Sequence, residues 1–199
     1  MSEVSQPAPQ PPTATSWSRI ARRIRVPVGF VFAAVFLWLA RPTRASLIAG
    51  ALIMLPGLLL RGLASGHVQK DKQLTTSGPY AYTRNPLYLG SLMLAAGFAI
   101  AARSWWIVAL MLLMFALIYI PVIAGEERYL RQTFPEYDDY SRRVPRMLPR
   151  MSPRLSPYAT QQSAYSSARY WKHREYQASI GCAVVLALLI IKLVANLVW

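Results

Sequence analysis

The feature that most constrains the fold is a stretch of 22 residues, 104–125, that contains no charged side chain. A helix of this length crosses the roughly 30 Å hydrocarbon core of a bilayer. With four further apolar segments, the expected spans are 26–40, 45–64, 87–102, 104–125 and 178–198. These segments lack the polar face that a helix of a soluble bundle presents to water. The sequence therefore predicts an all-α integral membrane bundle of five transmembrane helices.

The remaining composition indicates one domain without a metal site. Residues 1–18 are rich in Pro, Ser and Gln, which is typical of a disordered tail rather than a signal peptide. We expect residues 19–199 to form a single membrane domain, because the chain is long enough for one domain and hardly for two. The single cysteine, Cys182, lies in an apolar run and excludes an intrachain disulfide and a thiolate metal cluster. Two histidines are too few for a histidine-box di-iron enzyme.

The spacing of the segments and the distribution of charge predict the topology. Only Arg103 separates the third and fourth spans, which predicts a tight antiparallel hairpin. With the N-terminus inside, seventeen Lys and Arg residues lie in inner segments and three in outer loops. The positive-inside rule then places the N-terminus and the segments 65–86 and 126–177 in the cytoplasm, and the C-terminus outside. Anionic lipid headgroups explain this basic charge, so we expect a lipid bilayer as partner and no nucleic acid.

Polar and aromatic residues precede the third span, in the stretch 76–90. A Gly-Pro step predicts a turn, and Asn85-Pro86 predicts a helix start with proline in its first turn. The tyrosines of this stretch are typical of an interfacial aromatic belt. Arg84 is not explained by either feature. Beside the exposed amides of a helix N-terminus, it adds positive potential where an anion could bind.

Two adjacent glutamates, Glu126 and Glu127, follow the fourth span. Glu127 has Arg131 at i+4, and an ion pair on the helix surface would explain it. Glu126 has no cationic neighbour at i+3 or i+4. An unpaired acid at membrane depth is a candidate for function, and we therefore interpret Glu126 as a ligand-binding residue.

The charged motifs are expected to meet at one cytoplasmic mouth of the hairpin. Arg84 opens the hairpin, the two glutamates close it, and Arg143 and Arg146 follow in the same inner segment. A cationic turn, a carboxylate pair and an arginine cluster predict a ligand that carries both charges.

The stretch GPYAYTRNPLYLG, followed by GEERYL and EYDDYSRRVPRMLP, resembles the isoprenylcysteine carboxyl methyltransferase family and its bacterial and archaeal relatives. The signature of that family is Arg-His-Pro-x-Tyr-x-Gly, then Glu-Glu, then Arg-Val-Pro. The more distant phosphatidylethanolamine N-methyltransferases share the tyrosine-rich turn and the glutamate pair. The resemblance covers residues 67–149.

The resemblance implies a cytoplasmic pocket for S-adenosyl-L-methionine between helices, and a lipophilic substrate that arrives from the bilayer. The cofactor-binding residues that it implies are Gln73, Leu74, Thr75, Tyr80, Asn85, Pro86, Leu87, Tyr88 and Glu126. We add His67 and Glu127 as candidates. Arg84, Arg143 and Arg146 are candidates for positioning the substrate or the cofactor. Since the sulfonium group already activates the methyl group, the protein has mainly to position the reactants and exclude water.

Two positions depart from the family. Asn85 replaces its histidine, and Val122 stands where the eukaryotic enzymes have an arginine that holds the substrate. We expect methyl transfer to a small lipophilic acceptor, in the first place a carboxylate. The alternatives are a phospholipid or amine N-methyltransferase, an NADPH-dependent membrane reductase of the steroid reductase type, and a non-catalytic lipid-binding scaffold. No G-x-G-x-x-G motif supports a Rossmann-type site, and no motif indicates an oligomeric state.

Overall fold

The computed structural model describes residues 31–68, 73–149 and 165–198, and within these ranges it contains helices and no strand. The chain divides into two compact units, 1–38 and 39–199. In the first unit a helix begins by residue 31, and the ring centroids of Phe32 and Phe36 lie 6.3 Å apart. The expected N-terminal tail lies outside the described residues. The all-α prediction agrees with the part of the chain that is described.

Helix α2, Arg44–His67, begins with a reciprocal capping arrangement. The Ser46 amide donates to the Thr43 hydroxyl at 3.2 Å, and the Thr43 amide donates to the Ser46 hydroxyl at 2.9 Å. Two backbone amides at the start of the helix are thereby given hydrogen-bond partners. The Ser46 hydroxyl also lies 3.0 Å from the Ala101 carbonyl oxygen, to which it donates. A hydrogen bond therefore links the start of α2 to the end of the neighbouring helix α3.

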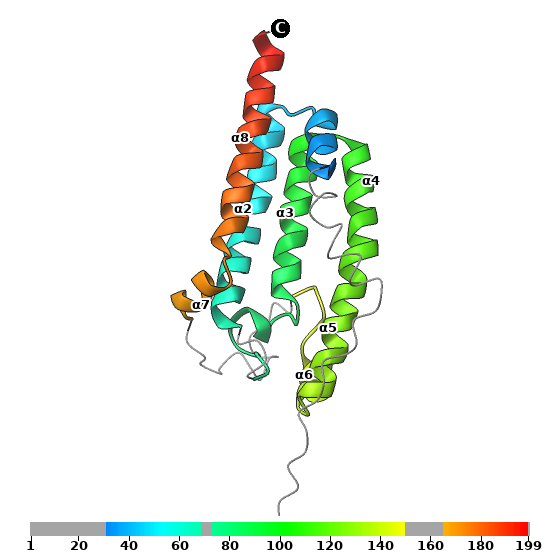
Figure 1. Cartoon of the computed structure of the whole chain (residues 1–199), viewed down its shortest axis with the longest axis vertical. Coiled ribbons are helices and arrows are strands. Elements are labelled where there is room, and N and C mark those ends of the chain that lie inside the picture. Colours follow the sequence, from blue (N-terminus) through cyan, green and yellow to red (C-terminus); the bar gives the residue numbers. More distant parts are fainter. Residues whose placement is uncertain (1–30, 69–72, 150–164, 199) are drawn as a thin grey trace, which may run out of the picture. The chain divides into compact units, whose positions relative to one another are not determined.

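Close contact between α2 and α3 (Pro86–Ala102) forms the centre of the second unit (Figure 1). Glycines face each other across it in two pairs. A Cβ at Gly50 would lie 2.5 Å from the Gly97 carbonyl oxygen, and a Cβ at Gly57 would lie 3.0 Å from the Gly90 carbonyl oxygen. Small residues let helix backbones approach closely, which is a common way of packing helices in membranes.

A tight hairpin joins α3 to the next helix, as the sequence predicts. Arg103 caps α3 with a φ of 52°, and α4, Trp105–Met114, starts two residues later. The chain then continues without interruption through a π-helical turn, Phe115–Tyr119, labelled η2, and through α5, Ile120–Thr133. A π-turn of this kind contains one extra residue and often lies at a functional site.

The helix that contains the fourth predicted span continues past the end of that span. The helix does not stop at Gly125 but runs to Thr133, so both glutamates lie inside α5 rather than at its end. The residues after Gly125 are polar, but they include no helix breaker before Phe134. The helix therefore continues beyond its apolar part.

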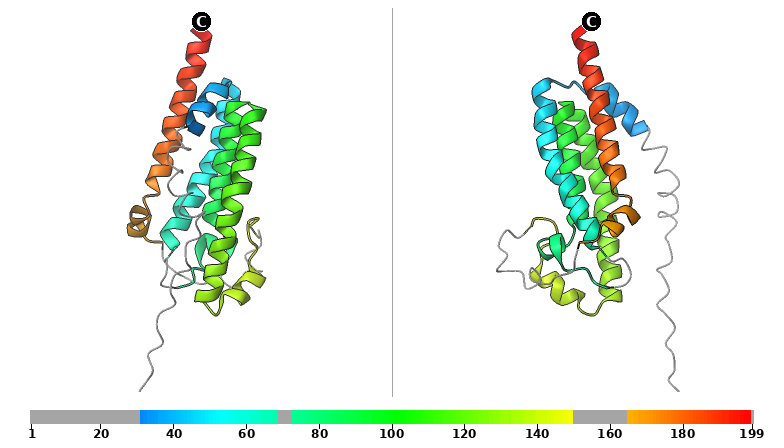
Figure 2. Two further views of the ribbon diagram at one scale, coloured as in Figure 1. Left: turned by 45° about the vertical axis from the view of Figure 1, so that its right-hand side comes forward. Right: turned by 90° about the vertical axis from the view of Figure 1, so that its left-hand side faces the viewer.

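Short elements gather at one end of the unit, which we call the polar end. It comprises the C-terminal turns of α2 and α5, the N-terminus of α3, and the elements η1 (Gly78–Ala81), α6 (Tyr137–Arg143) and α7 (Ser167–Lys172). Helix α8, Tyr176–Val198, starts near this end and leads away from it (Figures 1 and 2).

Three of the five expected spans are long and apolar enough to cross a membrane. They are Arg44–His67, Trp105–Thr133 and Tyr176–Ala195. The apolar helix α3 is shorter, with 17 residues, and the first expected span lies partly outside the described residues. Large apolar side chains of the long helices point outward, such as Leu52, Leu112 and Ile191. Such surfaces match lipid rather than water, which indicates an integral membrane protein.

Candidate functional site

Glu126 faces the N-terminal part of α3 across the hairpin. The Tyr88 hydroxyl donates a hydrogen bond to Glu126 Oε2 at 2.8 Å. The ring of Tyr88 meets the ring of Tyr119 edge to face, with centroids 6.0 Å apart. Tyr119 is the last residue of the π-turn, so the extra residue of that turn sets the position of this aromatic pair. Glu126 therefore has a partner that the sequence analysis did not identify.

Glu127 lies between two arginines from different segments. Glu127 Oε1 is 3.5 Å from Arg84 Nη1, and Glu127 Oε2 is 3.1 Å from Arg146 Nη2. Arg84 Nη1 also donates to the Tyr137 hydroxyl at 3.3 Å. The side chains of Arg84 and Glu127 are 15% and 18% exposed, so water screens this contact only in part. The structure thus brings together the turn, the carboxylate pair and the arginine segment.

The expected ion pair between Glu127 and Arg131 is wrong. Arg131 instead pairs with Asp138 of α6, with 2.7 Å between Nε and Oδ1. The i+4 spacing permitted the first pair, but Arg84 and Arg146 are brought to Glu127 by the folding of segments distant in the sequence.

Two buried polar atoms of this cluster have no hydrogen-bond partner among the described residues. They are Arg84 Nε, a donor, and Glu127 Oε1, an acceptor. Burying such atoms without a partner is costly. The two arginines stand against the adjacent carboxylates of Glu126 and Glu127, so the formal charges of the site balance. A ligand with an anionic group and a donor would satisfy both atoms.

Asn85 connects the turn to the segment after α6. Its side-chain amide donates to the Arg146 carbonyl oxygen at 3.0 Å, and the Arg84 amide donates to the Pro145 carbonyl oxygen at 2.9 Å. The Thr83 hydroxyl donates to the Met147 carbonyl oxygen at 3.0 Å. Asn85 is buried and acts here as a hydrogen-bond donor to backbone. Pro86, the first residue of α3, is buried beside it.

Tyr80 lies between the site and the start of α8. The Tyr140 hydroxyl donates to the Tyr80 carbonyl oxygen at 2.7 Å, which fixes the turn. Burial of the phenol, and then the negative charges of Glu126 and Glu175, raise the pKa of Tyr80 well above its usual range. The hydroxyl therefore stays protonated at neutral pH and remains a hydrogen-bond donor.

An ion pair that the sequence analysis missed lies beside Tyr80. Arg61 of α2 holds the carboxylate of Glu175 with Nε and Nη2, at distances of 2.9 to 3.1 Å. Arg61 Nη1 also donates to the Ser91 hydroxyl and to the Leu87 carbonyl oxygen, the latter at 3.4 Å. Arg61 lies inside the expected span 45–64. Its occurrence within an apolar run was the signal for a buried partner.

Among the other predicted cofactor residues, His67 lies against the turn at Gly78. Its Nδ1 is 2.8 Å from the Leu63 carbonyl oxygen, to which it donates. A Cβ at Gly78 would lie 2.7 Å from the His67 ring, and Gly78 has a φ of +58°, so both space and conformation require glycine there. Leu74 packs against the buried core of α6, whereas Gln73 is exposed and Thr75 half-buried.

Two further positions lie apart from the cluster. Arg143 pairs with Asp139 on the same helix at 2.9 Å, and both side chains are about half exposed. Val122, where the resemblance expects an arginine, lies on α5 with 49% of its surface exposed. The structure therefore brings Arg84 and Arg146, but not Arg143, to the glutamates.

Comparisons with known proteins support part of this interpretation. Residues 58–137 match the family model described as phospholipid methyltransferase. The cobalt-zinc-cadmium resistance protein CzcN of Cupriavidus metallidurans is 42% identical over 77 residues. The nickel-cobalt-cadmium resistance protein NccN of Alcaligenes xylosoxydans xylosoxydans is 40% identical over 77 residues. Each match covers 39% of this chain and 36% of the relative, so the chain spans about a third of the curated relatives that it matches.

No solved structure matches the chain. Within the described ranges, no group of three His, Cys, Asp or Glu side chains is placed to hold a metal ion. The matched segment begins in α2 and ends at Tyr137, and it contains Arg61, the turn, α3 and both glutamates. Residues 58–137 therefore match the phospholipid methyltransferase family, the more distant of the two families that the sequence resembles.

Proposed function

We propose that the protein is an integral membrane methyltransferase that uses S-adenosyl-L-methionine and acts on a lipophilic acceptor, in the first place a carboxylate. The family match supports methyl transfer at a membrane. The observation that carries the proposal is the pair of unsatisfied buried atoms, Arg84 Nε and Glu127 Oε1, inside the matched segment. They form a prepared site for a ligand with both charges.

The residues present fit the chemistry of this cofactor. Its amino-acid portion carries a carboxylate and an ammonium group, which the unpaired atoms of Arg84 and Glu127 would hold. Glu126 would accept from ribose hydroxyls. Tyr88 would present its ring to the adenine or to the sulfonium, and the protonated hydroxyl of Tyr80 would donate nearby.

The protein's own contribution is positioning. When bound, the cofactor supplies a methyl group that its sulfonium already activates. A carboxylate acceptor is ionised at neutral pH and needs no general base. Arg146, with a side chain 44% exposed, lies at the open side of the cluster, where it would orient such a carboxylate. The apolar helices around the site would limit access of water.

The second candidate acceptor is the amine of a phospholipid, because the matched family is described as phospholipid methyltransferase. An amine must lose a proton before it can attack, so this reaction would need a base. Methyl transfer from a labelled cofactor to phosphatidylethanolamine, compared with a long-chain carboxylate, distinguishes the two acceptors.

Calorimetric binding of S-adenosylhomocysteine to the detergent-purified full chain tests the cofactor. We expect micromolar binding that the Glu126→Ala variant loses. Glu136→Ala is the matched control, because Glu136 is an exposed glutamate at the start of α6. If the folded protein bound NADPH and not S-adenosylhomocysteine, the reductase alternative would replace this proposal.

We also propose that the polar end faces the cytoplasm, from the excess of Lys and Arg in the segments around it. A Ser141→Cys variant reports on this, since Ser141 lies on α6 at the polar end. A membrane-impermeant maleimide should label it only after the membrane is permeabilised. Labelling in intact cells would reverse the topology.

A further inference from the structure

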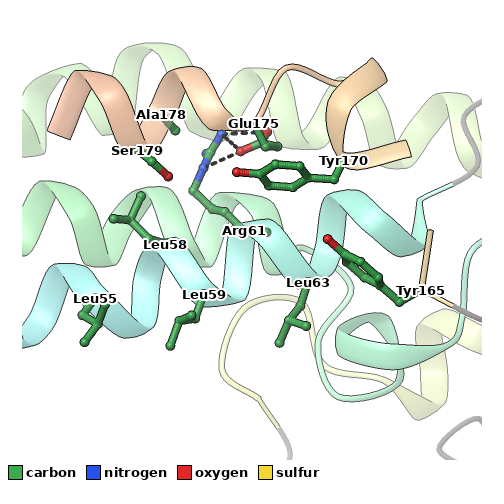
Figure 3. A pocket seen from close by; sticks show the side chains of 11 residues that line it. Leu55, Leu58, Leu59, Arg61, Leu63, Tyr165, Tyr170, Glu175, Ala178 and Ser179 are labelled. Carbon is green, nitrogen blue, oxygen red and sulfur yellow. Dashed lines mark hydrogen bonds and ion pairs between the residues drawn. The ribbon is translucent and has the colours of Figure 1, made fainter. Parts of the chain in front are cut away.

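A groove of about 390 Å³ runs along α2, opposite α7 and the start of α8, in the same size range as ordinary ligand pockets. Figure 3 shows Arg61 and Leu58 reaching from α2 toward the start of α8. The residues that line it are Leu55, Leu58, Leu59, Arg61, Gly62, Leu63, Tyr165, Tyr170, Glu175, Ala178 and Ser179.

The groove is apolar along its length and charged at one end. Leu58 and Leu55 lie one and nearly two helical turns before Arg61 on α2, toward the middle of the apolar span. Leu59 is 59% exposed, so the groove is open to the surrounding lipid. The charged end is the pair of Arg61 and Glu175, whose side chains are only 21% and 12% exposed. A ligand with a long apolar chain and a charged head group would match the apolar length and the charged end of the groove.

The contact between the Glu175 side chain and Arg61 indicates that a carboxylate head group of a ligand would fit this end of the groove. Both of its oxygens accept hydrogen bonds from Arg61, in the two-pronged arrangement that guanidinium groups form with carboxylates. Glu175 follows Arg174, which has a φ of +54°, a conformation that is uncommon for a residue with a side chain. Glu175 is therefore held in the turn between α7 and α8 rather than within a helix, and an external carboxylate of the same geometry could take its place.

We propose that this groove binds a long-chain carboxylate, with its apolar chain along Leu58 and Leu55 and its head on Arg61 in place of Glu175. Arg61 supplies a guanidinium group from α2, whereas the family position for a substrate-holding arginine is Val122 on α5. The displaced Glu175 turns toward solvent at the polar end, so that no buried charge is left unpaired.

The groove is adjacent to the candidate active site. Arg61 also donates to the Leu87 carbonyl oxygen, and the next residue, Tyr88, binds Glu126. The groove and the glutamate cluster thus contact neighbouring residues of α3. Binding in the groove does not depend on methyl transfer, and the groove is a site apart from Arg146, which would orient the acceptor under the proposed function.

Binding is measured with a dansyl-labelled undecanoic acid and the full chain in phosphatidylcholine nanodiscs, without cofactor. Dodecanoate should displace the probe, and dodecanol, which has the same chain and no charge, should not. Arg61→Gln should weaken binding by about tenfold, because a charge-assisted contact is lost. Glu175→Gln should strengthen binding by about threefold, because the neutral amide competes less well for Arg61.

The proposal predicts that Arg61→Gln and Glu175→Gln change the binding affinity in opposite directions. An ion pair with only a structural role would make both variants equal or worse than the unchanged protein, and that result would overturn the proposal, as would equal displacement by dodecanol. Leu58→Trp, which fills the groove without touching the ion pair, should reduce binding even if Arg61→Gln does not fold. Arg103→Gln, at the far end of α3, is the control. Binding of S-adenosylhomocysteine, measured in parallel, reports separately on the proposed function.

Discussion

The α2–α3 contact and the polar end are built in different ways. The contact involves two helices, and its closest approaches are between glycine backbones. The polar end collects side chains from α2, η1, α3, α5, the segment after α6 and the turn before α8. Backbone atoms thus define the first region, whereas charges and hydroxyl groups define the second. Substitutions should therefore affect stability in the first region and ligand binding in the second.

The largest effect on stability is expected at Gly50. In Gly50→Ala the new methyl group would lie 2.5 Å from the Gly97 carbonyl oxygen. Overpacking of this kind should lower the free energy of unfolding by about 2 kcal/mol, measured by thermal unfolding in micelles. Gly181→Ala is the matched control, because no heavy atom lies within 4 Å of its added Cβ. Equal destabilisation by both substitutions would show that the contact is not specially close.

At the polar end, Arg84→Gln should reduce the affinity for S-adenosylhomocysteine by about tenfold, because it removes a charged donor from the cluster. The unfolding temperature should change little by comparison with Gly50→Ala. Arg142→Gln serves as control, since that side chain is 75% exposed. If both arginine variants bound the ligand equally well, Arg84 Nε, the atom without a hydrogen bond, would have no role in binding.

Tyr80 predicts a dependence of stability on alkaline pH. Its pKa is raised in the folded protein, so only the unfolded state releases this proton just above the ordinary pKa of 10.0. The contribution is complete below that pH and is lost as pH rises through it, by about 1.4 kcal/mol per pH unit. Unfolding temperatures recorded on both sides of pH 10 should fall less steeply for Tyr80→Phe. Identical slopes would contradict the raised pKa.

The smallest effect is expected at Asn85, where the sequence departs from the family. A histidine can also donate to the Arg146 carbonyl oxygen, so Asn85→His should cost less than about 1 kcal/mol. Asn85→Ala removes the amide's hydrogen bond to that carbonyl, which then keeps only the Thr83 hydroxyl at 3.3 Å, and should cost more. Thermal unfolding of the two variants makes the comparison. A histidine variant as unstable as the alanine variant would show that the size and shape of the Asn85 side chain matter, and not only its hydrogen bond.

The sequence contains enough information for the helices and the hairpin but not for the contacts at the polar end. Apolar runs, the single residue Arg103 between two of them, and the step Asn85-Pro86 are local signals, and each is found where a helix starts, turns or runs. The apolar run ends at Gly125, whereas the helix continues to Thr133. Helical propensity continues across that boundary.

The site could be anticipated only as a set of motifs. Spacing within a helix suggested Arg131 for Glu127, but its partners Arg84 and Arg146 come from segments that only the fold brings together. In the same way, Arg61 and Glu175 are 114 residues apart, a separation at which sequence pattern gives no information on pairing. The structure shows that Glu175 is the partner of Arg61.

The π-turn between α4 and α5 has a consequence for how this helix can change. One residue corresponds to about 100° of rotation around a helix axis. The extra residue in Phe115–Tyr119 therefore rotates α5 about the helix axis relative to α4. The α4 half can keep its face toward lipid while the α5 half directs Glu126 toward Tyr88. Deleting a single residue there would leave a longer regular helix of almost unchanged composition, but its carboxylates would point in another direction.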